Sequence, residues 1–237
     1  MFDALDREHL KNKWDQVQAN VKAACERSGR SLDEVHVIGV SKTVEADVMN
    51  ASIEFGVKIL GENRVQEILR KYEDVVDGPQ WHLIGHLQTN KVKYIIDRVD
   101  MIHSVDSIKL AKEINKQAAK QGKKMKVLIQ VDMANEASKF GLPADQVRDL
   151  LGQVSELDHI EVEGLMFIAP FIQDQDLIRS YFRAMKDLFE SLKTLTYDNV
   201  SMKHLSMGMT NDYELAIEEG ATLLRVGTGI YGPRDYT

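Results

Sequence analysis

Short apolar runs and longer helical patterns alternate along the chain. Eight short runs are predicted to be strands, and most of them are rich in Val, Ile and Leu, as is typical of strands buried on both faces of a parallel sheet. They cover residues 35–40, 57–60, 81–84, 101–105, 126–131, 162–169, 203–207 and 223–226. Between them, apolar residues recur every three or four positions, which predicts an amphipathic helix after every strand except the last.

The helical segments have recognisable starts and ends. One helix precedes all the strands and ends at Gly29, and its apolar face consists of Leu10, Trp14, Val17, Val21 and Ala24. Thr43 is predicted to cap the helix after the first strand. The later helices are predicted over residues 65–72, 89–98, 107–121, 143–154, 178–192 and 212–219.

The order of these elements predicts the fold class. Eight strands with no Pro-, Gly- or Ser-rich linker between them indicate an α/β fold, a single closed parallel (β/α)8 barrel of the TIM type, as one domain over residues 1–237. The extra N-terminal helix would supply the eighth outer helix. An open doubly wound sheet is the alternative, but Ser41-Lys42-Thr43 follows the first strand where that fold usually has a glycine-rich turn. We therefore expect the barrel.

Composition and charge exclude several classes of partner. The net charge of −7 leaves no basic excess to neutralise a nucleic acid. No apolar run approaches the length of a membrane span, and the N-terminus is too charged for a signal peptide. The only cysteine, Cys25, has no partner for an internal disulfide, which fits a reducing compartment. We expect a cytoplasmic protein without nucleic-acid or membrane partners.

Lys42 stands where the first buried strand ends. The carboxyl ends of strands are where α/β folds hold their chemistry. An apolar wall disfavours the charged form of a lysine and makes its amine a better nucleophile. Lys42 is therefore a candidate nucleophile, and the alternative is a solvated lysine that only closes the strand.

Two loops rich in small residues follow the last two strands, which is the usual position of a phosphate site in such barrels. Their glycines let the backbone approach an anion, and their hydroxyl groups can donate hydrogen bonds. The residues concerned are Ser206, Gly208 and Thr210 in one loop and Gly227, Thr228 and Gly229 in the other. Arg225 lies within the last strand itself.

Each of these residues also has a purely structural interpretation. The Gly-Thr-Gly triplet could be only a tight turn, Arg225 could face outward between helices, and His82 could be a hydrogen-bonded core histidine. Met166, Met207 and Met209 could fill gaps in a core. The seven histidines and one cysteine show no metal-ligand spacing, so no metal site is expected. A lysine together with a phosphate loop is nevertheless the minimum that a pyridoxal 5′-phosphate (PLP) site requires.

Eight segments of the chain closely resemble the pyridoxal phosphate homeostasis proteins, single-barrel PLP-binding proteins related to the N-terminal barrel of alanine racemase. The matching segments span nearly the whole chain in the order of the family. They are VIGVSKT (37–43), GENRVQE (61–67), WHLIGHLQTNK (81–91), IHSVDS (102–107), VLIQVDMANEASKFGL (127–142), GLMFIA (164–169), LSMGMTNDYELAI (205–217) and LLRVGTGIYGPR (223–234).

The resemblance implies a role for each matched residue. Lys42 matches the lysine that holds PLP as a Schiff base, Arg225 matches the arginine that faces the pyridine nitrogen, and Asn63 matches a residue that lines the cofactor. The residues that match those around the phosphate are Ser206, Gly227 and Thr228. The cofactor implied is PLP.

Three functions are compatible with these residues. The resemblance favours a protein of intracellular PLP homeostasis that binds the cofactor without substrate turnover, with apo PLP enzymes as candidate recipients. The alternative is a racemase-like PLP enzyme, which needs a second acid–base group opposite Lys42. Related racemases take that group from a C-terminal domain of the partner subunit, and we expect no such domain here, since no segment that resembles it follows the last strand up to Thr237. A lysine aldolase acting on a phosphorylated sugar is the third possibility.

We expect the first of these functions, in a monomeric and non-catalytic protein. The candidates for a second acid–base group are His82 inside a strand, Tyr213 in a short helix and Tyr231 beyond the last strand, and none is an evident partner for Lys42. Arg225 would also disfavour protonation of the pyridine nitrogen, which weakens the ring as an electron sink.

Overall fold

Eight parallel strands close into a barrel, as the sequence predicts. The computed structural model describes residues 2–134 and 140–233, so residues 135–139 and 234 of the matched segments lie outside the described residues. The strands are β1 (His36–Val40), β2 (Ile59–Glu62), β3 (Gln80–Leu83), β4 (Met101–Val105), β5 (Met125–Asp132), β7 (Ile160–Phe167), β8 (Val200–Met209) and β9 (Leu223–Val226). They pair in the order β4-β3-β2-β1-β9-β8-β7-β5, and the β4–β5 pairing closes the ring. An additional two-residue strand, β6 (Leu142–Pro143), pairs with the last two residues of β5.

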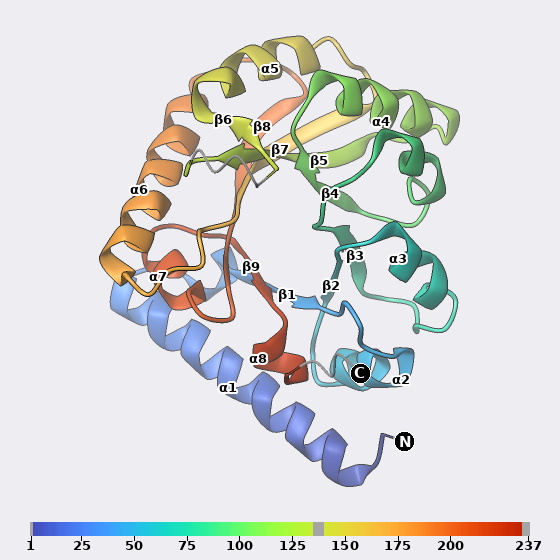
Figure 1. The fold of residues 1–237 in the computed structure, drawn as a ribbon, viewed down its shortest axis with the longest axis vertical. Coiled ribbons are helices and arrows are strands. Elements are labelled where there is room, and N and C mark those ends of the chain that lie inside the picture. The colour runs from blue at the N-terminus through green and yellow to red at the C-terminus, as the bar shows by residue number, and fades with distance from the viewer. Residues whose placement is uncertain (1, 135–139, 234–237) are drawn as a thin grey trace.

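The helices form an outer ring around the barrel (Figure 1). They are α1 (Ala4–Ser28), α2 (Ala46–Glu54), α3 (Val65–Lys71), α4 (Ile108–Lys120), α5 (Val147–Val154), α6 (Gln175–Leu192), α7 (Tyr213–Glu218) and α8 (Thr228–Tyr231). Short 3₁₀ helices cover Leu32–Glu34, Thr89–Tyr94 and Ala144–Gln146. None of the helices within the described residues is both long and apolar enough to cross a membrane.

The N-terminal helix α1 completes the outer ring. It packs against α2, α7 and α8 and so covers the barrel where the chain begins and ends. Its apolar face is buried as predicted, its first turn is capped by Asp3, and it ends at Gly29 in the left-handed conformation with φ 66°.

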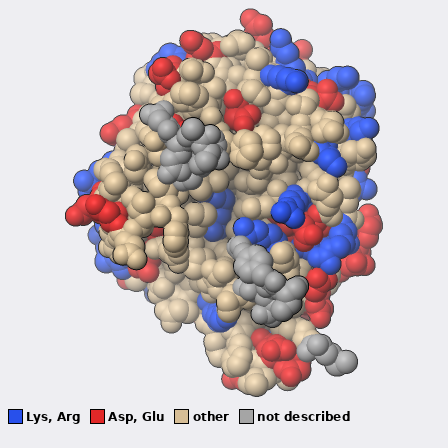
Figure 2. Space-filling view, viewed as in Figure 1, with Lys and Arg blue, Asp and Glu red and all other residues tan. Residues whose placement is uncertain are grey.

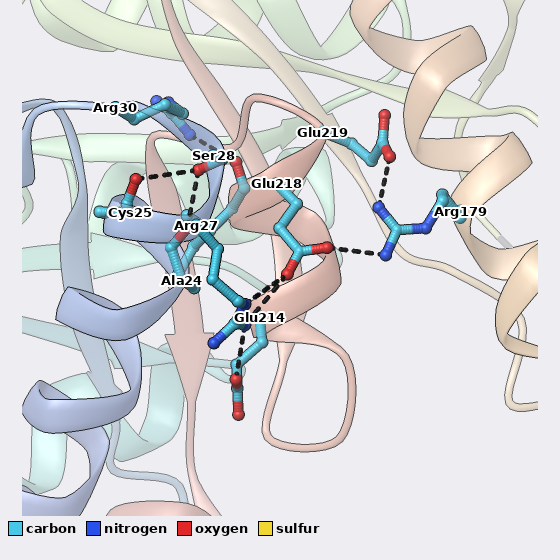
Figure 3. A network of polar contacts seen from close by, with 10 residues as sticks. Ala24, Cys25, Arg27, Ser28, Arg30, Arg179, Glu214, Glu218 and Glu219 are labelled. Atoms are coloured by element: carbon cyan, nitrogen blue, oxygen red, sulfur yellow. Dashed lines mark hydrogen bonds and ion pairs between the residues drawn. The ribbon is translucent and has the colours of Figure 1, made fainter.

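Arginines tie α1 and α6 to α7 (Figure 3). Arg27 of α1 contacts Glu218 of α7 at 3.0 Å and Glu214 at 2.9 Å. Arg179 of α6 contacts the same Glu218 at 2.7 Å and Glu219 at 2.6 Å. Exposed ion pairs contribute little one by one, but a shared carboxylate links three helices in one network.

Apolar residues fill two separate regions. The larger lies between the strands and the surrounding helices. The smaller consists of Ile38, Met101, Leu128, Met166 and Leu223, from five different strands, and therefore lies inside the barrel. The barrel is a packed core rather than a channel.

Several predicted boundaries are wrong. Thr43 does not cap α2: its φ is 64°, and α2 begins three residues later after Glu45, with no side-chain cap. The helix predicted over 89–98 is a 3₁₀ helix that ends at Tyr94, since its β-branched apolar residues are poor helix formers.

Three further boundaries differ. The second strand begins two residues later than predicted, at Ile59, and β8 extends beyond the predicted 203–207 at both ends. The short helix α8 directly after β9 was not predicted.

Candidate functional site

A cavity of about 660 Å³ opens where the carboxyl ends of the strands meet. Its walls come from the segments that follow β1, β2, β3, β7, β8 and β9. Figure 2 views this end of the barrel and shows a hollow near its centre with Lys and Arg side chains in and beside it. We call this the upper cavity. Its position agrees with the predicted location of the chemistry.

The upper cavity brings together five of the six predicted site residues. They are Lys42, Asn63, Arg225, Gly227 and Thr228. Ser206 is not on the cavity wall: its side chain is fully buried within the barrel and contacts Arg225. The strand places Ser206 one layer below the cavity, so the structure gives it a different position from the other five.

The residues on both sides of Lys42 are held by hydrogen bonds. The Ser41 hydroxyl donates to Glu62 Oε1 at 2.8 Å, and the Ser41 backbone N–H donates to the Gly61 carbonyl at 3.0 Å. The Thr43 backbone is hydrogen-bonded to the Glu67 carboxylate. Thr43 is the only non-glycine residue in the described part of the chain with a positive φ, a conformation that is costly for a β-branched side chain. These contacts hold the turn that carries the half-buried Lys42.

A buried ionic cluster lies behind this turn. Lys71 is 2% exposed and contacts Glu62 at 2.9 Å, Glu67 at 2.8 Å and the Ser41 carbonyl at 2.9 Å. Burial raises the pKa of Glu62 against the opposing effect of Lys71. Burial would raise the pKa of Glu67 as well, but hydrogen bonding and charge from Lys71 and Arg70 lower it. The cluster joins β1, β2 and α3 directly below Lys42, and the sequence analysis did not identify it.

Arg225 points into the barrel rather than outward. It donates through Nη1 to Ser206 Oγ at 2.6 Å and through Nη2 to the Phe167 carbonyl at 2.8 Å. Burial lowers the pKa of Arg225 to about 10, while the nearby charge of Asp212 acts in the opposite direction. Arg225 therefore remains a cation at neutral pH, and it lies in the wall of the upper cavity.

A chain of buried hydrogen bonds continues below Arg225. Ser206 Oγ lies 3.0 Å from His103 Nδ1, and His103 Nε2 lies 2.9 Å from His82 Nδ1. Burial lowers the pKa of His82 to about 3 and the pKa of His103 well below its ordinary value, so both rings are neutral. His82 is thus a buried, hydrogen-bonded histidine, as its purely structural interpretation from the sequence predicts.

The direction of these hydrogen bonds follows from the two ends of the series, because Arg225 can only donate and Gln80 Oε1 can only accept. Ser206 accepts from Arg225, and its own hydrogen then has His103 Nδ1 as acceptor. His103 carries its hydrogen on Nε2 and donates to His82 Nδ1. The hydrogen of His82 is therefore on Nε2, which faces Gln80 Oε1 at 3.4 Å.

The glycine-rich turn after β9 packs against the turn after β8. The Gly229 backbone N–H donates to Thr210 Oγ1 at 3.2 Å. Thr210 and Asp212 also line the upper cavity, and Asp212 accepts a hydrogen bond from the Met209 backbone. Thr210 was predicted to offer a hydroxyl donor to a phosphate. No role was predicted for the Asp212 side chain, and its position shortly after a buried strand was the available signal.

Among the three methionines and the two candidate tyrosines, only Met209 lines the upper cavity. Met166 and Met207 are core residues, whereas Met209 lines the upper cavity. Tyr213 accepts a hydrogen bond from Asn20 at 2.9 Å, and the Tyr231 hydroxyl lies 3.1 Å from that of Ser52. Neither tyrosine lines the upper cavity. In the described part of the chain, no three His, Cys, Asp or Glu side chains are grouped as metal ligands.

Comparisons with known proteins agree with this geometry. The family model of the alanine racemase N-terminal domain matches residues 13–235. A pyridoxal phosphate homeostasis protein of Aquifex aeolicus is 44% identical over 94% of this chain and 98% of its own length. The chain belongs to the pyridoxal phosphate homeostasis protein family.

Solved structures of other proteins share this fold. The structure of PipY from Synechococcus elongatus with PLP bound has a TM-score of 0.80 at 32% identity, over 90% of this chain and 100% of that chain. An alanine racemase of Clostridium difficile has a TM-score of 0.73 at 14% identity, over 96% of this chain and 57% of that chain. The racemase therefore shares the fold, and PipY shares both fold and sequence.

In this member of the homeostasis family, the upper cavity combines three kinds of group. Lys42 supplies an amine, Arg225 supplies a buried cation, and the turn at Gly227 and Thr228 supplies backbone and hydroxyl donors. An amine can condense with a carbonyl compound, and the donors can bind an anion. The cavity is thus suited to a small molecule that carries both a carbonyl and an anionic group.

The buried cluster below Lys42 gives a first prediction. Lys71→Met leaves Glu62 buried without its cation and should lower the free energy of unfolding by about 3–5 kcal/mol. The double variant Lys71→Met/Glu62→Leu should recover most of this loss, because no uncompensated charge remains. Urea unfolding measures both. The control is Lys11→Met, which removes an exposed ion pair with Asp15 and should cost less than about 1 kcal/mol. Equal losses for Lys71→Met and Lys11→Met would contradict the role of the cluster.

The buried histidines give a second prediction. They stay neutral in the folded protein, while in the unfolded chain they bind protons below a pH of about 6.5. Stability is therefore lost as the pH falls from about 6.5 toward the folded pKa of His82, about 3. His103→Gln should make the decline between pH 6 and 5 shallower by about 1.4 kcal/mol per pH unit. Urea unfolding at several pH values measures the slope. His9→Gln, at an exposed position, should leave it unchanged, and an unchanged slope in His103→Gln would show that His103 titrates normally.

Proposed function

We propose that this protein binds PLP in the upper cavity and takes part in intracellular PLP homeostasis. The observation that carries the proposal is the meeting of Lys42, Arg225 and the Gly227–Thr228 turn on one cavity wall, in a chain of this family. PipY, a relative at 32% identity, has been solved with PLP bound. The upper cavity falls within the range of small-molecule sites.

The residues present fit PLP at both of its ends. When bound, PLP supplies an aldehyde that can join a lysine as a Schiff base and a ring that withdraws electrons. Lys42 is the residue proposed to hold the aldehyde carbon, since it provides the amine on a turn fixed from both sides. The phosphate is assigned to Gly227 and Thr228, with Thr210 beside them.

Arg225 and Asn63 are assigned to the ring of the cofactor. Arg225 is a permanent donor with a positive charge, so it favours an unprotonated pyridine nitrogen. Asn63 follows β2 and lines the same cavity. Ser206 is proposed to act through Arg225, which it holds in place, and not on the phosphate itself.

The same residues support binding without substrate turnover. A racemase needs a second acid–base group opposite the lysine. The polar ends of His82, Tyr213 and Tyr231 are engaged with His103, Asn20 and Ser52, away from the upper cavity. An unprotonated ring is also a weaker electron sink. The alternative, a racemase-like enzyme, lacks such a group among these candidates.

A protein that holds PLP at a half-buried lysine without consuming it is suited to storage and release. We propose the cytoplasm as its compartment, because the single cysteine is a buried free thiol. Apo PLP enzymes are the proposed recipients.

Lys42 should carry the cofactor covalently. PLP-loaded protein should show the absorption of a Schiff base, and borohydride reduction should fix a pyridoxyl mass on the peptide that contains Lys42. Lys42→Ala should lose both signals, while Lys116→Ala, on the exposed side of α4, should keep them. Mass spectrometry after reduction provides the measurement. A pyridoxyl mass on another lysine in the wild-type protein would overturn the assignment.

Amino-acid turnover should be at most slow. A missing acid–base group typically costs about 10²–10⁴-fold in rate. PLP-loaded protein is incubated with L-alanine in deuterated water, and both α-deuteration and D-alanine are followed. Deuteration without D-alanine would agree with a site that has one base. Sustained formation of D-alanine that Lys42→Ala abolishes would establish the racemase alternative instead.

A further inference from the structure

A second cavity, of about 800 Å³, lies at the opposite end of the barrel. Its walls come from the amino ends of the strands and the residues just before them, so it shares no lining residue with the upper cavity. We call it the lower cavity. Its polar lining includes Lys58, Lys123, Lys124, Lys126, His36, His82, His204, Gln80, Asp100 and Glu163.

The lower cavity carries more positive than negative charge, although the protein as a whole has a net charge of −7. Four lysines face two carboxylates. Glu163 is already paired with Lys203 at 2.8 Å, outside the cavity lining, and lies 4.0 Å from Lys126. Asp100 accepts a hydrogen bond from the Trp81 backbone at 2.8 Å. The remaining cationic charge lies mainly at the mouth, where Lys58, Lys124 and Lys126 are exposed.

The floor of the cavity offers a buried donor. The hydrogen-bond chain that starts at Arg225 leaves the hydrogen of His82 on Nε2, and His82 is 2% exposed and lines the cavity. On that side its hydrogen-bond partner among the described residues is Gln80 Oε1, which is 3.4 Å away and forms only a weak hydrogen bond. An anion would be a stronger acceptor for this N–H than the Gln80 amide oxygen.

Two further observations connect the histidines and lysines. After burial, the charges of His204 and Lys126 are the next causes that lower the pKa of His82, which places these three residues around one space. His204 Nδ1 is buried and has no hydrogen-bond partner among the described residues. A buried polar atom without a partner is uncommon in folded proteins.

We propose that the lower cavity binds a small phosphate-class anion, held by Lys58 and Lys126 at its mouth and by His82 Nε2–H on its floor. Lysine ammonium groups bind phosphate as point charges, and a neutral imidazole N–H adds a directional donor. The volume admits inorganic phosphate or a small phosphate monoester. This site is independent of the PLP site and does not rest on the proposed function.

The test uses inorganic phosphate as the probe on the PLP-loaded full-length protein. Binding is followed by calorimetry and by tryptophan fluorescence, because Trp14 lines the lower cavity. In this preparation PLP occupies the upper cavity, and the absorption of the bound cofactor, recorded during the same titration, reports whether phosphate displaces it. Sodium chloride at equal ionic strength controls for general screening.

Removing the two lysines should weaken binding. Lys58→Gln/Lys126→Gln should lower the phosphate affinity by about tenfold or more, since each charged contact typically contributes one decade or more. Lys22→Gln/Lys116→Gln removes the same charge from exposed helix positions and should leave the affinity unchanged. Equal weakening in both double variants would mean that only net charge matters and would overturn the site. The absence of heat and fluorescence change at millimolar phosphate in the wild type would overturn it as well.

Discussion

The guanidinium of Arg225 lies inside a closed barrel, where its charge and its N–H donors need partners. Several polar groups of the barrel interior supply them. Arg225 is buried, and moving an unpaired cation of this size out of water costs several kcal/mol. Ser206, the Phe167 carbonyl and the charge of Asp212 offset this cost from two neighbouring strands and the turn after β8. Ser206 in turn engages His103 and His82. One buried charge therefore determines the chain of polar side chains that separates the upper from the lower cavity.

A second buried cation has a comparable role beside Lys42. Lys71 reaches from α3 under the ends of β1 and β2 and binds carboxylates from two elements. Two lysines with different roles thus lie close to one turn: Lys71 is fully engaged and inaccessible, and Lys42 lies on the cavity wall. The turn that carries Lys42 is thus held by contacts within the protein.

Much of the barrel could be predicted from the sequence, because most strands are short apolar runs that end at a glycine or a polar residue. Lys42, Arg225 and Thr228 could be placed on one face for the same reason, since strand ends converge in a barrel. Whether a strand residue points into the cavity or one layer below it depends on barrel register, so the contact of the Ser206 side chain with Arg225 inside the barrel could not be predicted.

Contacts between distant parts of the chain were not predictable in the same way. His82 and His103 are separated by 21 residues, and His103 and Ser206 by 103, so no local pattern relates them. Lys71 looks in sequence like the polar face of a helix, and only the packing of α3 shows that it is buried. The positive φ of Thr43 was not predictable either, because it runs against the preference of a β-branched residue.

The pairing of β1 with β9 has a consequence for how the protein is made. Val37 lies opposite Leu224, and Ile38 opposite Arg225, so the first strand to leave the ribosome can acquire its second neighbour only when the last strand has been synthesised. Lys42 and Arg225 consequently remain apart for almost the whole of translation. Non-local pairings of this kind form late in folding. Any ligand that needs both residues at once can be captured only by a finished, closed barrel, so its binding reports the completion of the chain.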